Sequence, residues 1–125
     1  MTAQASMTEI YMGVAEVHIP PHRLGVTTMM VAHVYGVRPD ALMAATRTGR
    51  RTAEARQVAM YLAHVVFRMN LATVARGFGR DRTTVRHACR HVEELREDPE
   101  RDRVVAWLEV LLRETASTST VEDGQ

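Results

Sequence analysis

The residues with the most distinctive chemistry stand together at positions 79–90, in the run Gly-Arg-Asp-Arg-Thr-Thr-Val-Arg-His-Ala-Cys-Arg. Its first glycine predicts the end of one helix, and Asp81 is a suitable N-cap for the next. The opening turns of that second helix carry arginine, threonine and histidine, whose side chains bind phosphate oxygens and base edges. The pattern is typical of a recognition helix that presents its N-terminal residues to the major groove of DNA.

Several of these side chains also have an ordinary structural interpretation. Thr83 and Thr84 offer methyl groups to thymine and hydroxyls to bases or phosphates, or they are first-turn threonines that cap the helix. His87 lies one turn further along the same face, where it contacts DNA or is solvated. Arg86 can reach a phosphate or a base, whereas Arg90 is a clamp on the DNA backbone or a solvated charge. The flanking arginines favour the DNA role for both threonines and for His87.

Catalysis and metal binding are the competing chemistries in this segment. His87 and His91 are four residues apart, but Cys89 between them is expected to face the core, and no second ligand pair has useful spacing. Glu93 and Glu94 belong to the charge run of an exposed helix and lack the partner that acid–base catalysis requires. We therefore expect no catalytic residue, no metal site, no cofactor and no enzymatic activity.

Six helices are expected to position this run, and no strand or internal repeat is evident, so the predicted fold class is all-α. The clearest apolar spacing, at i, i+3, i+4 and i+7, marks the third helix. The expected helices cover about 24–35, a short segment starting at 37–40, and then 53–69, 71–76, 82–97 and 99–113. The fourth and fifth form a helix-turn-helix. The buried stripe expected for the last helix is Val104, Leu108, Leu111 and Leu112, with Val105 and Trp107 at its margins.

The chain of 125 residues suits one domain with a modest core. We expect a mobile N-terminal tail over 1–22, a helical domain over 23–114 and a disordered C-terminal tail over 115–125. No stretch reaches the roughly 18 apolar residues of a membrane span. The single cysteine cannot form an internal disulfide and agrees with a reducing cytoplasm.

Charge is strongly segregated along the chain, although the net charge is only +1. Residues 23–90 hold twelve arginines against three acids, a balance of +9, and residues 91–125 hold ten acids against four arginines, a balance of −6. A basic surface beside an acidic one is typical of a protein that binds nucleic acid. Every basic residue in the Lys+Arg total is arginine, which is the better bidentate partner for phosphate and guanine.

The run at 79–90 closely resembles the DNA-reading helix of the bacterial chromosomal replication initiator DnaA. The shared features are an aromatic-glycine turn followed by Arg-Asp-x-Thr-Thr-Val-x-His-Ala-Cys-Arg. The similarity extends over about 31–96 and includes Val-Ala-His-Val-Tyr at 31–35 and Arg-Gln-Val-Ala-Met-Tyr-Leu-Ala at 56–63. It implies about six helices with a helix-turn-helix, like the DnaA C-terminal domain and the Trp repressor.

The resemblance also implies which residues meet DNA. In the family, a basic loop places an arginine in the minor groove, the central helix contacts phosphates, and the recognition helix reads short asymmetric boxes in the major groove. The family's minor-groove arginine aligns nearest Thr48, so its neighbours are the candidates. The residues carried over are Arg47, Arg50 and Arg51 in the loop, Arg56 and Gln57 in the central helix, and Arg80, Asp81, Arg82, Thr83, Thr84, Arg86 and His87 at the recognition helix.

The chain departs from the family pattern at three points. Arg82 stands where the family usually has histidine, Gly79 stands alone where the family has two glycines, and 71–73 read Leu-Ala-Thr instead of Leu-Pro-Glu. These changes predict a preferred DNA site that is related to the initiator's box but altered at one or two positions.

The expected function is therefore sequence-specific binding of double-stranded DNA. The sequence contains no Gly-x-x-x-x-Gly-Lys-Ser/Thr phosphate loop and has no length for an ATPase domain, so we expect a cytoplasmic, nucleoid-associated transcriptional regulator or replication modulator without ATPase activity. The alternative is an interaction adaptor that keeps the fold and binds a protein partner through its acidic last helix. Neither function involves a membrane.

Overall fold

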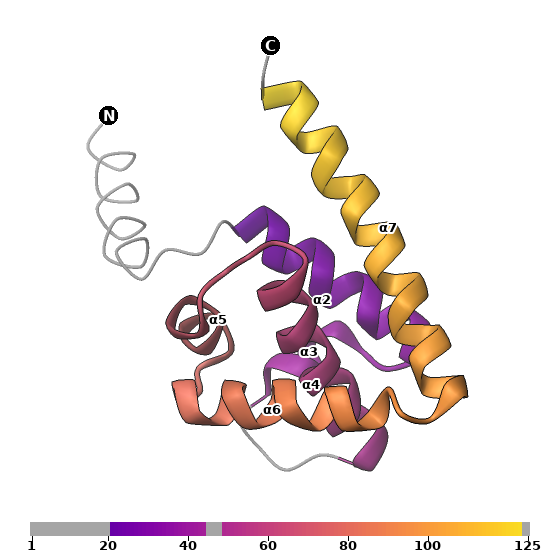
Figure 1. Cartoon of the computed structure of the whole chain (residues 1–125). Coiled ribbons are helices and arrows are strands. Elements are labelled where there is room, and N and C mark those ends of the chain that lie inside the picture. Colours follow the sequence, from indigo (N-terminus) through magenta and orange to yellow (C-terminus); the bar gives the residue numbers. More distant parts are fainter. Residues whose placement is uncertain (1–20, 45–48, 124–125) are drawn as a thin grey trace, which may run out of the picture.

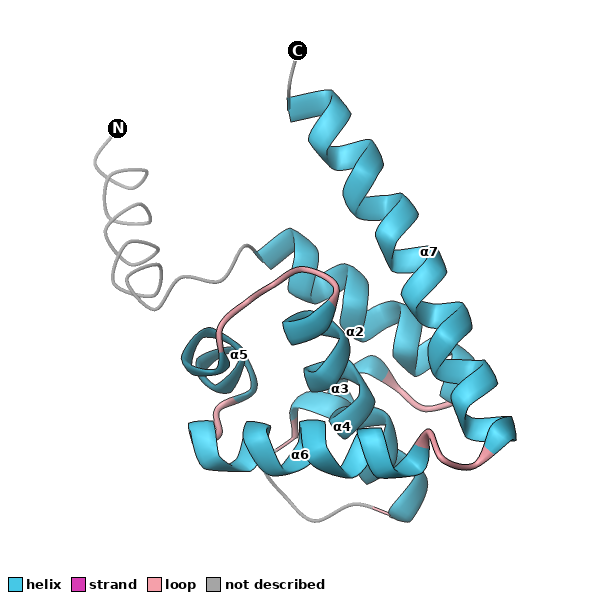
Figure 2. Ribbon diagram, viewed as in Figure 1, coloured by secondary structure: helices cyan, strands magenta, loops and turns pink. Residues whose placement is uncertain are grey.

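The computed structural model describes residues 21–44 and 49–123 of the chain. Within these ranges it contains helices and no strand, which confirms the predicted all-α class (Figures 1 and 2). No helix in the described part is long and apolar enough to cross a lipid bilayer. The helices are α2 (Pro21–Tyr35), α3 (Pro39–Met43), α4 (Arg50–Val65), α5 (Leu71–Phe78), α6 (Arg82–Leu95) and α7 (Pro99–Asp123).

The central helix of the fold is α4, which packs most extensively against α2 and α6. Its residues Val58, Ala59 and Leu62 are fully buried, as the apolar spacing of the sequence predicts. Figure 1 shows α6 crossing in front of α4, with α5 at one end of α6 and α7 rising from the other end. The described core is therefore built mainly around α4, which holds α6 at the surface, while α7 packs against α2.

Glycine and asparagine set several helix ends, and α5 runs to Phe78, two residues beyond its predicted end. Gly36 and Gly79 have φ angles of +68° and +66°, the left-handed conformation that ends α2 and α5. Asn70 caps α5, because its Oδ1 accepts a hydrogen bond of 2.8 Å from the amide of Thr73. Helix α5, the first helix of the helix-turn-helix, thus begins and ends through local chemistry.

Helix α4 differs from the prediction at both ends. It begins at Arg50 and not near Ala53, because Gly49 is extended and its carbonyl accepts the amide of Ala53 at 3.0 Å. Arg50 therefore lies in the first turn of a helix instead of the predicted loop. The helix ends at Val65 instead of Met69. Just beyond this end, Arg68 has a φ of +57°, the left-handed conformation that residues other than glycine rarely adopt.

Helix α7 also differs from the prediction. It continues to Asp123 rather than ending near Arg113, since neither glycine nor proline interrupts the chain before position 124. Its buried face contains Val105, which was expected at the margin. The predicted N-terminal tail falls largely on 1–20, outside the described residues. Of the predicted C-terminal tail, 115–123 belong to α7 and only 124–125 lie outside the described residues; the predicted domain boundaries are untested.

Candidate nucleic-acid interface

The turn between α5 and α6 brings the distinctive run to the surface. The left-handed Gly79 reverses the chain, and the amide of Arg80 donates to the Ala75 carbonyl at 2.8 Å. Asp81 occupies the N-cap position predicted for it, with an extended backbone. Its side chain forms no capping hydrogen bond, so the carboxylate is not needed to hold the start of the helix.

One face of α6 is buried and the other is open. Val85, Ala88 and Val92 pack into the core, at the spacing of one helical face. The residues predicted to meet DNA on this element are all exposed: Asp81, Arg82, Thr83, Thr84, Arg86 and His87. The structure therefore collects them on the first two turns of a single exposed helix, with two arginines among them.

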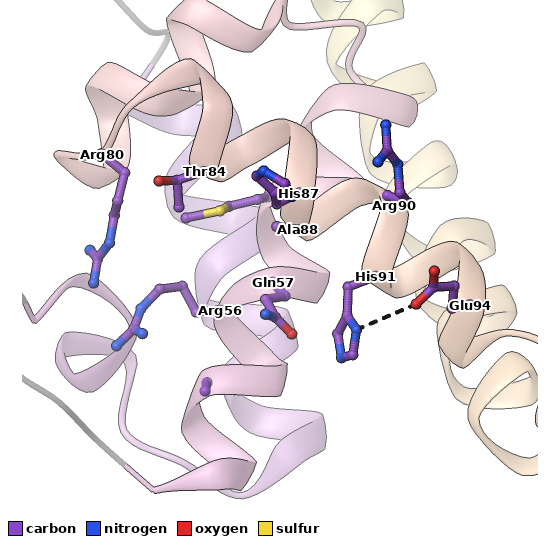
Figure 3. Close-up of a pocket in the computed structure, with 11 residues that line it drawn as sticks. Arg56, Gln57, Arg80, Thr84, His87, Ala88, Arg90, His91 and Glu94 are labelled. Atoms are coloured by element: carbon purple, nitrogen blue, oxygen red, sulfur yellow. Dashed lines mark ion pairs between the residues drawn. The ribbon is translucent and has the colours of Figure 1, made fainter.

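A groove of about 450 Å³ separates this helix from the N-terminal half of α4. Thr84, His87 and Arg90 line it from α6, and Gln57 lines it from α4 (Figure 3). The predicted central-helix residue Gln57 is thus brought beside the recognition helix. The lining combines apolar side chains such as Met60 with polar ones, and the cations on its α6 side are the groups that can contact a phosphate.

The groove also contains residues that the sequence-based site omitted. Arg90 and His91 line it, and His91 Nδ1 lies 3.9 Å from a carboxylate oxygen of Glu94 (Figure 3). The available signal was helical spacing, because His91 is one turn beyond His87 and Arg90 one turn beyond Arg86. Among the described residues, no three histidine, cysteine or acidic side chains are grouped so that they could hold a metal ion.

Two arginines predicted to face DNA are engaged inside the protein. Arg56 donates from Nε to the Leu42 carbonyl at 2.7 Å and from Nη2 to the Ala41 carbonyl at 3.1 Å. Arg80 donates from Nη2 to the Ala44 carbonyl and from Nη1 to the Phe78 carbonyl, both at 2.8 Å. Together they hydrogen-bond the carbonyls at the C-terminal end of α3, of which the Ala41 carbonyl also accepts the amide of Ala44 at 3.3 Å.

These two guanidinium groups lie near each other, as Figure 3 shows. Burial, and then the neighbouring positive charge of Arg80, lower the pKa of Arg56 from its usual value. The pair anchors Ala44, the last described residue before the basic loop. We name the interaction of Arg56 and Arg80 with the end of α3 the arginine clamp.

The basic loop is only partly covered by the described residues. Arg47 lies outside them. Arg50 is exposed in the first turn of α4, while Arg51 donates to the Tyr35 carbonyl at 3.0 Å and so caps the end of α2. Of the described arginines in this region, Arg50 projects to solvent, whereas Arg51 has a structural bond.

Arginines pair with three acidic side chains in the acidic C-terminal part of the chain. Arg96 binds Asp102 at 2.6 Å and Glu109 at 2.9 Å. Arg101 binds Asp98 at 2.8 Å and lies 3.5 Å from Glu54.

Cys89 is half-buried against the core and is no candidate nucleophile. Burial, and then the charge of Glu93, raise the pKa of its thiol to about 11, so that the thiol is protonated at neutral pH. The accessible polar groups of α6 are therefore the side chains of its arginines and histidines and the hydroxyls of its threonines.

Comparison with known proteins agrees with this geometry. The chain matches the family described as the bacterial dnaA protein helix-turn-helix over residues 28–92. It is 42% identical over 81 residues to the chromosomal replication initiator protein DnaA of Aquifex aeolicus, a match that covers 63% of this chain and 20% of that protein. The DnaA of Laribacter hongkongensis is 41% identical over 85 residues, which cover 66% of this chain and 18% of the relative. The chain thus spans about a fifth of the length of these relatives.

Solved structures show the same fold. A crystal structure of a DNA replication initiation factor matches with a TM-score of 0.68 and 36% identity, over 75% of this chain and 29% of the other. The replication initiator DnaA bound to AMPPCP and single-stranded DNA matches with a TM-score of 0.65 and 35% identity, over 74% and 28%. The matched region contains both helices of the helix-turn-helix and the central helix that supports them. The chain belongs to the family of bacterial DnaA helix-turn-helix domains.

Proposed function

We propose that this protein binds double-stranded DNA in a sequence-specific manner through α6. The observation that carries the proposal is the exposed N-terminal half of that helix, where cations and hydroxyls stand together on a face with no core contacts. A helix of this kind fits the major groove, and its first turns reach the base edges. The role that follows is control of transcription or modulation of replication, on the nucleoid and without ATP hydrolysis by this domain.

The residues are proposed to divide into two groups. Arg82, Thr83 and Thr84 would contact base edges because they lead the helix, with the guanidinium forking onto O6 and N7 of guanine. Arg86, His87, Arg90 and Gln57 would contact phosphates along the groove between α6 and α4. Arg50 or Arg47 would enter the minor groove, as the DnaA family suggests.

Double-stranded DNA fits this surface better than single-stranded DNA. Proteins that bind single strands without sequence preference stack bases on exposed aromatic rings. Helix α6 contains no phenylalanine, tyrosine or tryptophan, and Phe78 before it is buried. The single strand and the nucleotide in the solved relative belong to a chain of which only 28% is matched, and neither ligand is carried over.

Pairing of acidic side chains within the chain weakens the alternative that the protein is an interaction adaptor. It required acidic side chains on the last helix that are available to a partner. Asp102 and Glu109 of α7 are instead paired with Arg96, and Asp98 just before it is paired with Arg101. We therefore place DNA first and do not propose an acidic docking surface.

A salt titration on a short duplex, read by fluorescence anisotropy, tests the proposal. About six phosphate contacts would lower the affinity on the order of a thousandfold between 50 and 200 mM salt. Arg86→Ala should reduce both the affinity and the salt dependence. Arg113→Ala is the matched control, because it removes the same charge from an exposed position on α7.

Two results would contradict the proposal that α6 binds DNA. Binding that is absent, or that changes little with salt, would eliminate DNA as the main partner. Equal losses in Arg86→Ala and Arg113→Ala would show that only net charge matters and that α6 is not the interface.

A further inference from the structure

Helix α7 is apolar on more than one side. Its residues Val105, Leu108 and Leu112 are buried against the body of the protein. Trp107 and Val110 are nevertheless exposed, at 66% and 52%. Figure 1 shows this helix running along the side of the fold and projecting beyond it. Trp107 and Val110 are three residues apart and so adjacent on the helix surface, where they form one exposed apolar patch.

The exposed residues form a narrow stripe opposite the core. At about 100° per residue, Arg103, Trp107, Val110 and Glu114 fall within about 60° of one another, and their centre is about 160° from that of the buried face. The spacing of four, three and four residues is that of an a/d seam, by which two helices pack in a coiled coil. We call these four residues the α7 stripe.

The stripe is complementary to itself. Arg103 and Glu114 lie at equal distances from the midpoint between Leu108 and Glu109, and so do Trp107 and Val110. When two copies of α7 pack antiparallel about this midpoint, each Arg103 faces Glu114 of the other copy and each Trp107 faces Val110. A parallel arrangement would instead set like charges against each other. The order of charges therefore favours a second copy in the antiparallel sense.

The flanks of the stripe agree with this arrangement. Val104 and Leu111 are half-buried and lie beside it on one side, where they add apolar area to the contact. Since the stripe faces away from the core, the bodies of the two copies would lie on opposite sides of the helix pair. None of its residues belongs to α6, so the recognition helix stays open.

We propose that the α7 stripe is a self-association surface, on which a second copy of this chain docks with its α7 antiparallel. This goes beyond the proposed DNA binding and does not depend on it. Each dimer contains two symmetry-related ion pairs between Arg103 and Glu114. They surround an apolar centre made by Trp107 and Val110.

The full chain offers a direct test, because Trp107 is its only tryptophan. Sedimentation equilibrium should show a monomer–dimer equilibrium, and the tryptophan emission should shift to shorter wavelength as the dimer forms. Arg103→Glu should weaken dimerisation about tenfold, because two surface pairs change from attraction to repulsion. Glu114→Arg should do the same. The double variant Arg103→Glu/Glu114→Arg should return to within about threefold of the wild type.

The controls separate this contact from general effects of charge. Arg76→Glu reverses an exposed charge on α5, off the stripe, and should leave the dimerisation constant unchanged. Trp107→Ser should abolish the dimer while far-ultraviolet circular dichroism shows an intact helical fold. DNA titration of the same variants keeps the two proposals distinct, since a monomer that still binds DNA refutes only self-association.

Three results would overturn the proposal. The first is a monomeric mass at every concentration up to about 1 mM. The second is a double variant that dimerises no better than the single variants. The third is tryptophan emission that is already shielded in the monomer, which would show that another segment of the same chain covers the stripe.

Discussion

Replacing Arg80 with alanine tests whether this residue, at the start of the recognition helix, supports the fold or contacts DNA. The Arg80 side chain is half-buried and donates to the carbonyls of Ala44 and Phe78, at 2.8 Å each. The neighbouring Arg82 is exposed and has no hydrogen bond within the described protein. The two arginines are two residues apart, yet the structure predicts a large loss of stability when Arg80 is removed and almost none when Arg82 is removed.

The magnitude follows from the two bonds that are lost. A hydrogen bond from a charged donor contributes about 1.5 kcal/mol or more, and the Ala44 carbonyl keeps only a longer bond, of 3.5 Å, from Arg56. Arg80→Ala should therefore lower the free energy of unfolding by about 2–3 kcal/mol and the melting temperature on the order of 10 °C. Arg82→Ala should change the free energy of unfolding by less than about 0.5 kcal/mol.

Urea denaturation followed by circular dichroism measures both variants, and DNA anisotropy is measured on the same samples. Arg80→Lys sharpens the distinction, because lysine keeps the charge but not the two-pronged geometry. If Arg80 is part of the arginine clamp, lysine restores little stability. Wild-type stability in Arg80→Ala, with a loss of DNA affinity like that of Arg82→Ala, would refute the clamp.

Four further predictions follow from the same geometry. Arg82→His should move the motif selected from a random DNA library back toward the DnaA box, and identical motifs from both proteins would restrict Arg82 to phosphate contact. Arg50→Ala should weaken binding by roughly 1–2 kcal/mol, most strongly on A·T-rich sites, whereas equal affinity on all sites would remove it from the minor groove. Arg96→Ala should destabilise the fold by about 3 kcal/mol in thermal unfolding, because it leaves the half-buried carboxylates of Asp102 and Glu109 without their cation. The raised pKa of Cys89, about 11, means that iodoacetamide at pH 8 should modify the folded protein far more slowly than the unfolded one, and faster as the pH rises, so equal rates would contradict its burial.

Local sequence was sufficient to predict most of the helical framework. Gly36, Gly79 and Asn70 act through their own backbone or side chain, so the helix ends they set are visible in the sequence. The long helix α7 shows the limit of this reasoning. Its polar last third was expected to lose helical structure, but without glycine or proline the helix continues from its packed first half.

The sequence by itself also determined the exposed face of α6. The 3.6-residue period separates Val85, Ala88 and Val92 from the cations and threonines, and no distant contact is needed to decide which side faces solvent. The spacing that exposes Thr84 and His87 likewise places Arg90 and His91 in the same groove.

Only the tertiary structure decided what the other arginines do. Arg51, Arg56 and Arg80 reach carbonyls that are 16, 14 and 36 residues away, at the C-terminal ends of α2 and α3. A guanidinium group can donate hydrogen bonds to a phosphate or to a backbone carbonyl, so its residue type cannot distinguish the two roles. Packing brings the carbonyls of these helix ends within reach of the three side chains, and that proximity gives them internal bonds that the sequence did not predict.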